Sequence, residues 1–313
     1  MAVDEFKALT KAFSGLGVDE KSLVTILGKW NQEKRQAFRK GTPQFFKEDD
    51  QQFERWLEGH VLQLRQEFLR FKDAIVAWTM HPWERDARIY HEALRSGPRF
   101  DMLIETACTR SSEDLLGARK AYHSLFERSI EEDITTYCIQ ASERKLLIAL
   151  VSAYRYEGPN VHQETAKSEA KIIYNAVKNG AKKKPIEDDE VVFLLSTRSK
   201  LHLQAIYKHY KGVSGKFLDE DLVGEMTMKQ VVQCLVSPPA YFSQVLHASL
   251  RTDVSEAARD SVTRIIITRA DVDMKQIKEE YLKKHGIPLP QKLEEVANGN
   301  YKEFLLTVAS TSD

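Results

Sequence analysis

The feature that most constrains the fold is an internal repeat. Three segments of the chain each contain a Thr-Arg dipeptide followed, twelve residues after the arginine, by a tyrosine. The three pairs are Arg110 with Tyr122, Arg198 with Tyr210, and Arg269 with Tyr281. A fourth, related segment occupies residues 23–36, with Trp30 in the place of the arginine. A spacing that recurs in this way predicts four similar units of about 70 to 90 residues.

Each unit has the apolar periodicity of helices. In the second unit, Leu103, Ile104, Ala107 and Cys108 fall on one helical face, and the pattern resumes after a break at SSED. At that break Ser111 and Asp114 have the spacing of a helix cap. Continuous strand-type alternation is absent from the sequence, so the predicted fold class is all-α.

The repeat divides the chain into four predicted domains. They are repeat 1 (1–86), repeat 2 (87–160), repeat 3 (161–245, with a charged linker at 157–190) and repeat 4 (246–313). The linker region contains one predicted helix and then AKKKPIEDDE, a basic run followed by an acidic run. Such runs are typical of solvated connectors.

The composition excludes several classes of protein. Lys plus Arg equals Asp plus Glu at 46 each, so no overall basic field favours nucleic acid, and we expect no nucleic-acid partner. Three scattered cysteines, Cys108, Cys138 and Cys234, suit reduced thiols in a cytosolic protein. Cys108 and Cys234 are expected in the core, with redox-sensitive thiols as the alternative. No apolar run approaches the roughly 20 residues of a spanning helix and no secretory leader opens the chain, so membrane contact is expected to be peripheral.

Three stretches then point to a family. They are AFSGLGVDEKS (12–22), AIVAWTMHPWERDA (74–87) and CTRSSEDLLGARKAYHSLF (108–126). Together with the four helical units they resemble the annexins, most closely those of plants, over nearly the whole chain. The resemblance implies four repeats of about five helices each in a curved array with a single core. It also implies a cytoplasmic protein that is reversibly recruited by calcium to acidic phospholipid membranes.

The resemblance further implies a calcium site in repeat 1. Its backbone ligands would be the carbonyls of Phe13, Gly15 and Gly17, and a carboxylate from a distant segment would complete it. Counting back from AIVAWTMHP places Glu67 there, whereas counting forward from the glycines favours Glu58, which stays the alternative. Leu16, between the glycines, is expected at an exposed loop tip, either inserted into the membrane interface or simply solvated.

The other repeats depart from this pattern. At the position of Gly17 they have Gly97, Pro185 and Glu256, and none keeps the glycine pair. At the carboxylate position they have Cys138, Glu225 and Val296. Most calcium sites are therefore expected to be lost, and basic residues of the degenerate loops are either direct contacts for anionic headgroups or solvated charges. These residues are Arg95, Arg99 and Lys182 to Lys184.

The predicted function is calcium-dependent binding of acidic phospholipid membranes through repeat 1. The alternative is a calcium-independent helical scaffold for membrane or protein interactions, and self-association or protein partners on the membrane are left open. We expect no enzymatic activity and no catalytic residues. The GxSxG and HExxH motifs are absent from the sequence. The segment YKGVSGKFL has Tyr210 and Phe217 at the positions where a phosphate-binding loop needs Gly and Ser or Thr. The nucleotidase and peroxidase activities suggested for plant annexins cannot be placed on residues.

Overall fold

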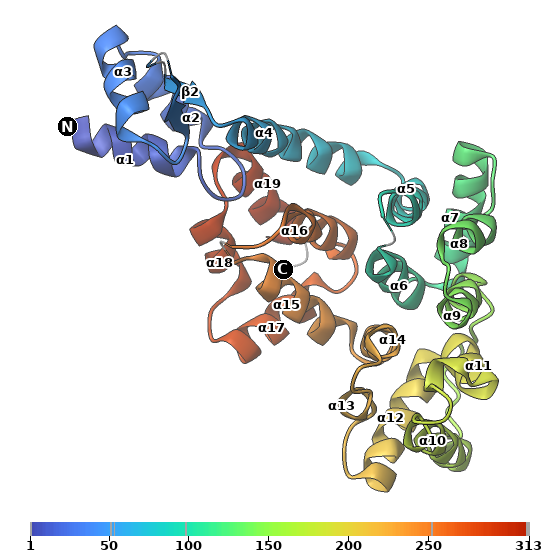
Figure 1. Cartoon of the computed structure of the whole chain (residues 1–313). Coiled ribbons are helices and arrows are strands. Elements are labelled where there is room, and N and C mark those ends of the chain that lie inside the picture. Colours follow the sequence, from blue (N-terminus) through green and yellow to red (C-terminus); the bar gives the residue numbers. More distant parts are fainter. Residues whose placement is uncertain (1, 51, 53, 98, 252, 311–313) are drawn as a thin grey trace. The chain divides into compact units, whose positions relative to one another are not determined.

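The chain folds mainly into α-helices, which confirms the predicted fold class (Figure 1). The computed structural model describes residues 2–50, 52, 54–97, 99–251 and 253–310. The chain forms two compact units. The first combines residues 1–79 with 242–313, and the second comprises residues 80–241.

The second unit contains two successive groups of helices. The first group is α5 (Pro82–Arg95), α6 (Phe100–Thr109), α7 (Ser112–Phe126), α8 (Ile130–Tyr137) and α9 (Ala141–Val151). The second group is α10 (Gln163–Lys178), the 3-10 helix η2 (Pro185–Glu187), α11 (Asp189–Thr197), α12 (Lys200–Ser214), α13 (Leu218–Asp221) and α14 (Met226–Val236).

Polar side chains fix where these helices begin. The N–H of Asp114 donates to the Ser111 hydroxyl at 3.1 Å at the start of α7, which confirms the predicted cap. Ser199 caps α12 in the same way, accepting from the N–H of His202. Because these caps satisfy backbone donors that a helix start leaves unpaired, the Thr-Arg-Ser sequence marks the turn between two helices in repeats 2 and 3.

The arginines and tyrosines of the repeat are structural. Arg110 binds the buried carboxylate of Asp86 through two hydrogen bonds, of 2.6 and 2.9 Å. Arg198 and His202 both bind Glu169. The three repeat tyrosines, Tyr122, Tyr210 and Tyr281, are fully buried. The recurring spacing therefore reflects a recurring core of buried tyrosines, while the arginines bind acids in different places: Arg110 and Arg198 bind Asp86 and Glu169, and Arg269 binds Asp273 four residues later.

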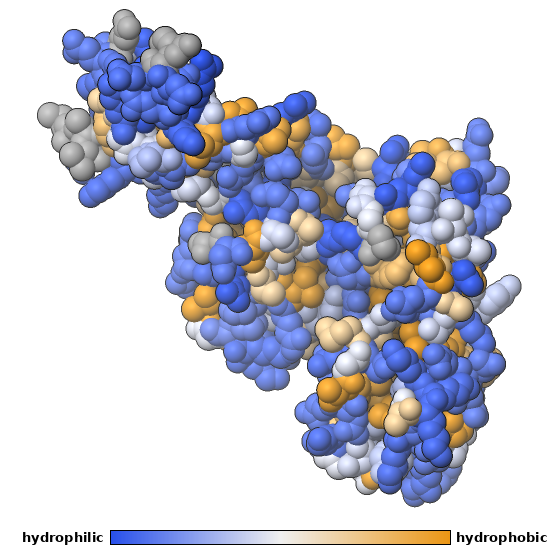
Figure 2. Space-filling model, in the orientation of Figure 1, coloured by the Kyte–Doolittle hydropathy of each residue, from blue (hydrophilic) through white to orange (hydrophobic). Residues whose placement is uncertain are grey.

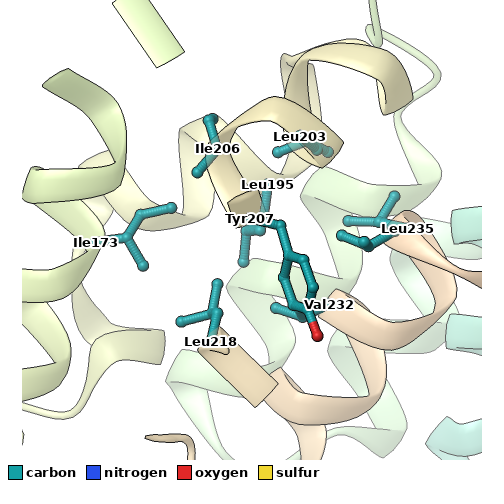
Figure 3. A pocket seen from close by; sticks show the side chains of 9 residues that line it. Ile173, Leu195, Leu203, Ile206, Tyr207, Leu218, Val232 and Leu235 are labelled. Atoms are coloured by element: carbon teal, nitrogen blue, oxygen red, sulfur yellow. The ribbon is translucent and has the colours of Figure 1, made fainter. Parts of the chain in front are cut away.

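The core around α10, α12 and α14 is closely packed. Figure 3 shows Tyr207 among apolar side chains that include Ile173, Leu195 and Leu218. The space that they enclose measures about 10 Å³, which is room for one water molecule at most. This cavity is a packing feature and not a ligand site.

The first unit combines both ends of the chain. Its first segment contains α1 (Ala2–Ala12), α2 (Glu20–Ser22), the π-helical turn η1 (Leu23–Leu27), α3 (Gln32–Gly41), the strands β1 (Phe46–Glu48) and β2 (Glu54–Trp56), and α4 (Glu58–Thr79). Its second segment contains most of α15 (Pro238–Ser249), α16 (Glu256–Arg269), α17 (Met274–His285), α18 (Leu289–Val296) and α19 (Gly299–Ser310). In Figure 1, α4 lies along α16 and α19, with which it is in contact.

A short hairpin departs from the all-helical expectation. Strands β1 and β2 pair antiparallel, with Phe46 opposite Trp56. Phe46 packs against Trp56 with ring centroids 4.1 Å apart, and Phe45 stacks on His60. Aromatic pairing of this kind favours an extended hairpin over another helical turn.

The helices also shift two of the predicted repeat limits. The limits after residues 86 and 245 fall inside α5 and α15. Helix α5 begins at Pro82, and the His81 side chain caps it by accepting from the N–H of Trp83. The helical groups therefore begin a few residues earlier than the sequence spacing indicated.

None of the helices in the described part of the chain has both the length and the apolar composition that a bilayer crossing requires. On the face shown in Figure 2, hydrophilic residues cover most of the surface, and apolar residues are scattered among them in small groups.

Removing the acid of the buried pair should destabilise the fold strongly. Asp86→Ala takes the bidentate partner from the buried Arg110, and the expected loss in unfolding free energy is about 3–5 kcal/mol. Glu84→Ala, on the same helix, breaks only an exposed pair with Arg88 and should cost less than about 1 kcal/mol. Urea denaturation followed by circular dichroism measures both, and equal small losses would contradict a structural role for the pair.

Candidate metal site

The two glycines near the amino terminus lie in a tight loop between α1 and α2. Gly15 and Gly17 have φ values of +93° and +80°, a region that other residues rarely adopt. A Cβ atom at Gly15 would lie 2.9 Å from the side-chain nitrogen of Asn298, and one at Gly17 would lie 2.8 Å from the Asn298 carbonyl oxygen. Only glycine therefore fits at these two positions.

The loop is fixed to the turn between α18 and α19. The N–H of Leu16 donates to the Val296 carbonyl at 3.0 Å, and the N–H of Asn298 donates to the Leu16 carbonyl at 2.7 Å. The Asn298 side chain also donates to the Ser14 carbonyl. Leu16 is only 5% exposed, so the expectation of an exposed loop tip was wrong. The backbone of Leu16 pairs with that of Ala297, and this pairing buries the Leu16 side chain.

The structure brings Glu67 to this loop. Its Oε2 accepts a hydrogen bond from the N–H of Gly17 at 2.6 Å, and the residue is 4% exposed. Glu58 is exposed at the start of the same helix, nine residues earlier, which corresponds to about 13 Å along the axis. Phe13 opens the loop, and its side chain packs in an aromatic cluster with Phe38 and Phe45.

An arginine that the sequence reasoning missed binds both the loop and Glu67. Arg259, on α16, places Nη1 3.1 Å from the Gly15 carbonyl oxygen and 3.1 Å from Glu67 Oε1. No local signal identified it, because the contact spans 192 residues of sequence. One cationic nitrogen therefore joins the backbone of the glycine loop to the buried carboxylate.

A second arginine holds Glu67 from its own helix. Arg70 donates to both oxygens of Glu67, at 3.0 and 3.2 Å, and also binds Glu256 and Asp260 on α16. Burial alone would lower the pKa of Arg70, but its hydrogen bonds and charge interactions with Glu67 and Asp260 raise it above the ordinary value. Glu67, Glu256, Asp260, Arg70 and Arg259 form one charged cluster. Its three carboxylates and two guanidiniums give it one net negative charge.

The donors at this site suit a hard cation. The Gly15 carbonyl and the Glu67 carboxylate supply oxygen, which calcium prefers at roughly 2.3–2.6 Å. Both oxygens already lie 3.1 Å from a common point, Arg259 Nη1. In the described ranges, no group of three or more His, Cys, Asp or Glu side chains is placed to hold a metal ion, so a metal here would depend on backbone carbonyls.

The corresponding positions of repeats 2 and 3 have other partners. Gly97 keeps a positive φ of +98°, but the carboxylate position is held by Cys138, a buried thiol whose pKa burial raises. In repeat 3, Lys184 Nζ lies 3.8 Å from Glu225 Oε1.

The thiol of Cys108 is also buried, and burial raises its pKa to about 12, as expected of a core cysteine.

Comparison with known proteins identifies the family. The annexin family model matches residues 85–150 and 241–308. Annexin D4 of Arabidopsis thaliana is 47% identical over 316 residues, which cover 99% of this chain and 98% of that protein. The chain belongs to the annexin family. Annexin Gh1 of Gossypium hirsutum is 36% identical, with 98% of this chain and 94% of that annexin covered. The solved structure of annexin III superimposes with a TM-score of 0.71 at 25% identity, covering 100% of this chain and 95% of annexin III.

Membership of the annexin family supports calcium-dependent binding of acidic phospholipid membranes as the general activity. The matched relatives include plant annexins, as the sequence predicted. Annexins are mainly calcium- and phospholipid-binding proteins, which is consistent with a role other than catalysis.

Replacing Gly17 by a residue with a side chain should destabilise the calcium-free protein. Gly17→Ala forces a Cβ atom against the Asn298 carbonyl at a positive φ, and the expected cost is at least about 1 kcal/mol. Gly59→Ala, in the same unit, meets no atom within 4 Å at the start of α4 and should stabilise by up to about 1 kcal/mol. Thermal denaturation in chelator compares them, and a neutral Gly17→Ala would contradict the close approach.

Proposed function

We propose that this annexin binds acidic phospholipid membranes through one calcium ion in repeat 1. The ligands from the protein are the carbonyls of Phe13, Gly15 and Gly17 and the carboxylate of Glu67. The observation that carries the proposal is the convergence of the Gly15 carbonyl and Glu67 Oε1 on one cationic nitrogen, 3.1 Å from each. The interactions of the loop already favour positive charge at that point.

The ion would link protein and membrane because the protein supplies only part of its coordination. Calcium takes six to eight oxygens, so water and lipid phosphate fill the positions that the loop leaves. With one such site, membrane affinity lacks the gain that several simultaneous contacts provide. We therefore propose a cytoplasmic protein whose recruitment is reversible and follows the calcium concentration.

Repeat 3 offers a second contact of a different kind. Lys182, Lys183 and Lys184 are exposed in the degenerate loop, and Val223 is exposed in the turn that also contains Glu225. Lysines at an anionic membrane surface contribute about 1 kcal/mol each. These residues would strengthen binding to acidic lipids without a second calcium ion.

The alternative function is a calcium-independent helical scaffold. One observation favours it: Glu67 in repeat 1 and Glu225 in repeat 3 are already paired with Arg259 and Lys184. If these pairs persist at every calcium concentration, membrane binding would be purely electrostatic. It would then weaken steeply with salt and not respond to calcium.

Sedimentation with vesicles distinguishes the two functions. In calcium, the protein should pellet with phosphatidylserine-containing vesicles, and excess chelator should release it, because the ion is the link. Vesicles of phosphatidylcholine alone are the control and should not carry the protein down. Equal pelleting with calcium and with chelator would rule out the calcium bridge and support the scaffold.

The carboxylate ligand can be tested by matched substitutions on α4. Glu67→Gln removes the charged oxygen pair, so calcium affinity measured by calorimetry should fall at least tenfold while the helical circular-dichroism signal stays unchanged. Glu58→Gln makes the same chemical change at the exposed start of the helix and should bind calcium as the wild type does. A loss of binding in Glu58→Gln alone would assign the ligand to Glu58.

A further inference from the structure

We propose that Arg259 is a built-in competitor of calcium, whose guanidinium occupies the cation position of repeat 1 and must leave before the ion binds. This inference rests on the proposed function of the same loop. It adds a regulatory element from repeat 4, which sets the calcium concentration at which repeat 1 responds.

The contacts of Arg259 reproduce part of the coordination of a cation. Its Nη1 donates to a backbone carbonyl of the glycine loop and to the acid from α4, the two kinds of oxygen that the calcium site requires. The side chain is 13% exposed and its bond to the buried Glu67 is largely shielded from water, whereas Gly15 is exposed. Hydrogen bonds between charged groups in such surroundings are among the stronger ones in proteins.

Arg70 has a different role, although it also binds Glu67. It contacts Glu67 three residues away on the same helix and reaches Glu256 and Asp260, but no bond joins it to the Gly15 carbonyl. We therefore assign Arg70 as the residue that positions the carboxylate. Arg259 is the cation that sits between the carboxylate and the loop.

The shared position makes binding of the ion and retention of Arg259 on the Gly15 carbonyl and Glu67 mutually exclusive. With both arginines in place, the cluster carries one net negative charge. When calcium binds and Arg259 turns toward Glu256, both cations stay within the cluster, but only calcium contacts the Gly15 carbonyl and Glu67. Two cations that contact the same oxygens repel each other, so exchange is the favoured outcome.

The structure also offers Arg259 a second partner. Its Nε lies 3.9 Å from Oε1 of Glu256, one turn earlier on α16, and the Glu256 side chain is half-exposed. A rotation of the side chain toward this acid frees the Gly15 carbonyl and Glu67 without leaving a guanidinium unpaired. The cost of displacement is then modest, and calcium binding is weakened but not abolished.

Calcium titrations of Arg259 variants test the competition. Arg259→Gln keeps the length and polarity of the side chain but loses its charge, so calcium affinity measured by calorimetry should rise about tenfold, comparable to one charge-assisted hydrogen bond. Arg88→Gln makes the same charge change at an exposed residue paired with Glu84 in the other compact unit, and its affinity should stay within about twofold of the wild type. Equal affinities of the Arg259→Gln variant and the wild type would overturn the proposal.

Two further measurements separate competition from other effects. In chelator, Arg259→Gln should melt at a lower temperature than the wild type, because Glu67 has lost a counter-charge, and calcium should reverse the difference. Arg259→Lys keeps the charge, so its affinity should rise less than that of Arg259→Gln. Equal rises in both variants would overturn electrostatic competition.

Calcium binding by the variants shows whether the competition or the calcium site itself is wrong. If Glu67→Gln abolishes calcium binding while Arg259→Gln leaves it unchanged, the site is correct and the competition is wrong. If neither the wild type nor Arg259→Gln binds calcium while both retain the helical signal, the calcium site itself is wrong, and the competition falls with it.

Discussion

The buried carboxylate of Glu67 determines how the glycine loop is built. A charged group this far from solvent is tolerated only when hydrogen bonds and opposite charges satisfy it. Glu67 meets this requirement with the N–H of Gly17 and the guanidiniums of Arg70 and Arg259. These partners come from the loop, from α4 and from α16. One acid therefore joins the first repeat to the last within one compact unit.

The same chemistry occurs elsewhere in the chain without any capacity for exchange. Arg110 and Asp86 in repeat 2 form a buried bidentate pair, and in repeat 3 the partly exposed Arg198 donates twice to one oxygen of the buried Glu169. What distinguishes Glu67 is that Arg259 joins it to the Gly15 carbonyl of a glycine turn, a backbone oxygen that a mobile cation can also bind. A structural ion pair and a metal site thus differ mainly in what surrounds the acid.

Much of this organisation was predictable from local patterns. The recurrence of arginine and tyrosine predicted the helical repeat. Because the helix between Glu67 and AIVAWTMHP is unbroken, counting back from AIVAWTMHP identified Glu67, the acid that contacts the loop. The hairpin at Phe46 and Trp56 was not predicted, because it depends on aromatic contacts between two short strands. Leu16 is buried where its backbone pairs with that of Ala297, nearly three hundred residues later in the sequence. Arg259 has its role because it contacts Glu67, nearly two hundred residues earlier. Periodicity within one segment carries no information about such contacts.

If Arg259 and calcium share one cation position, a crystal structure of the protein grown with calcium should show which of them occupies it. We expect an ion, identified by anomalous scattering, bound by the Gly15 carbonyl and Glu67, with the Arg259 guanidinium withdrawn toward Glu256. An Arg259 side chain that stays on Glu67 and the Gly15 carbonyl, with calcium ordered in another loop, would contradict it.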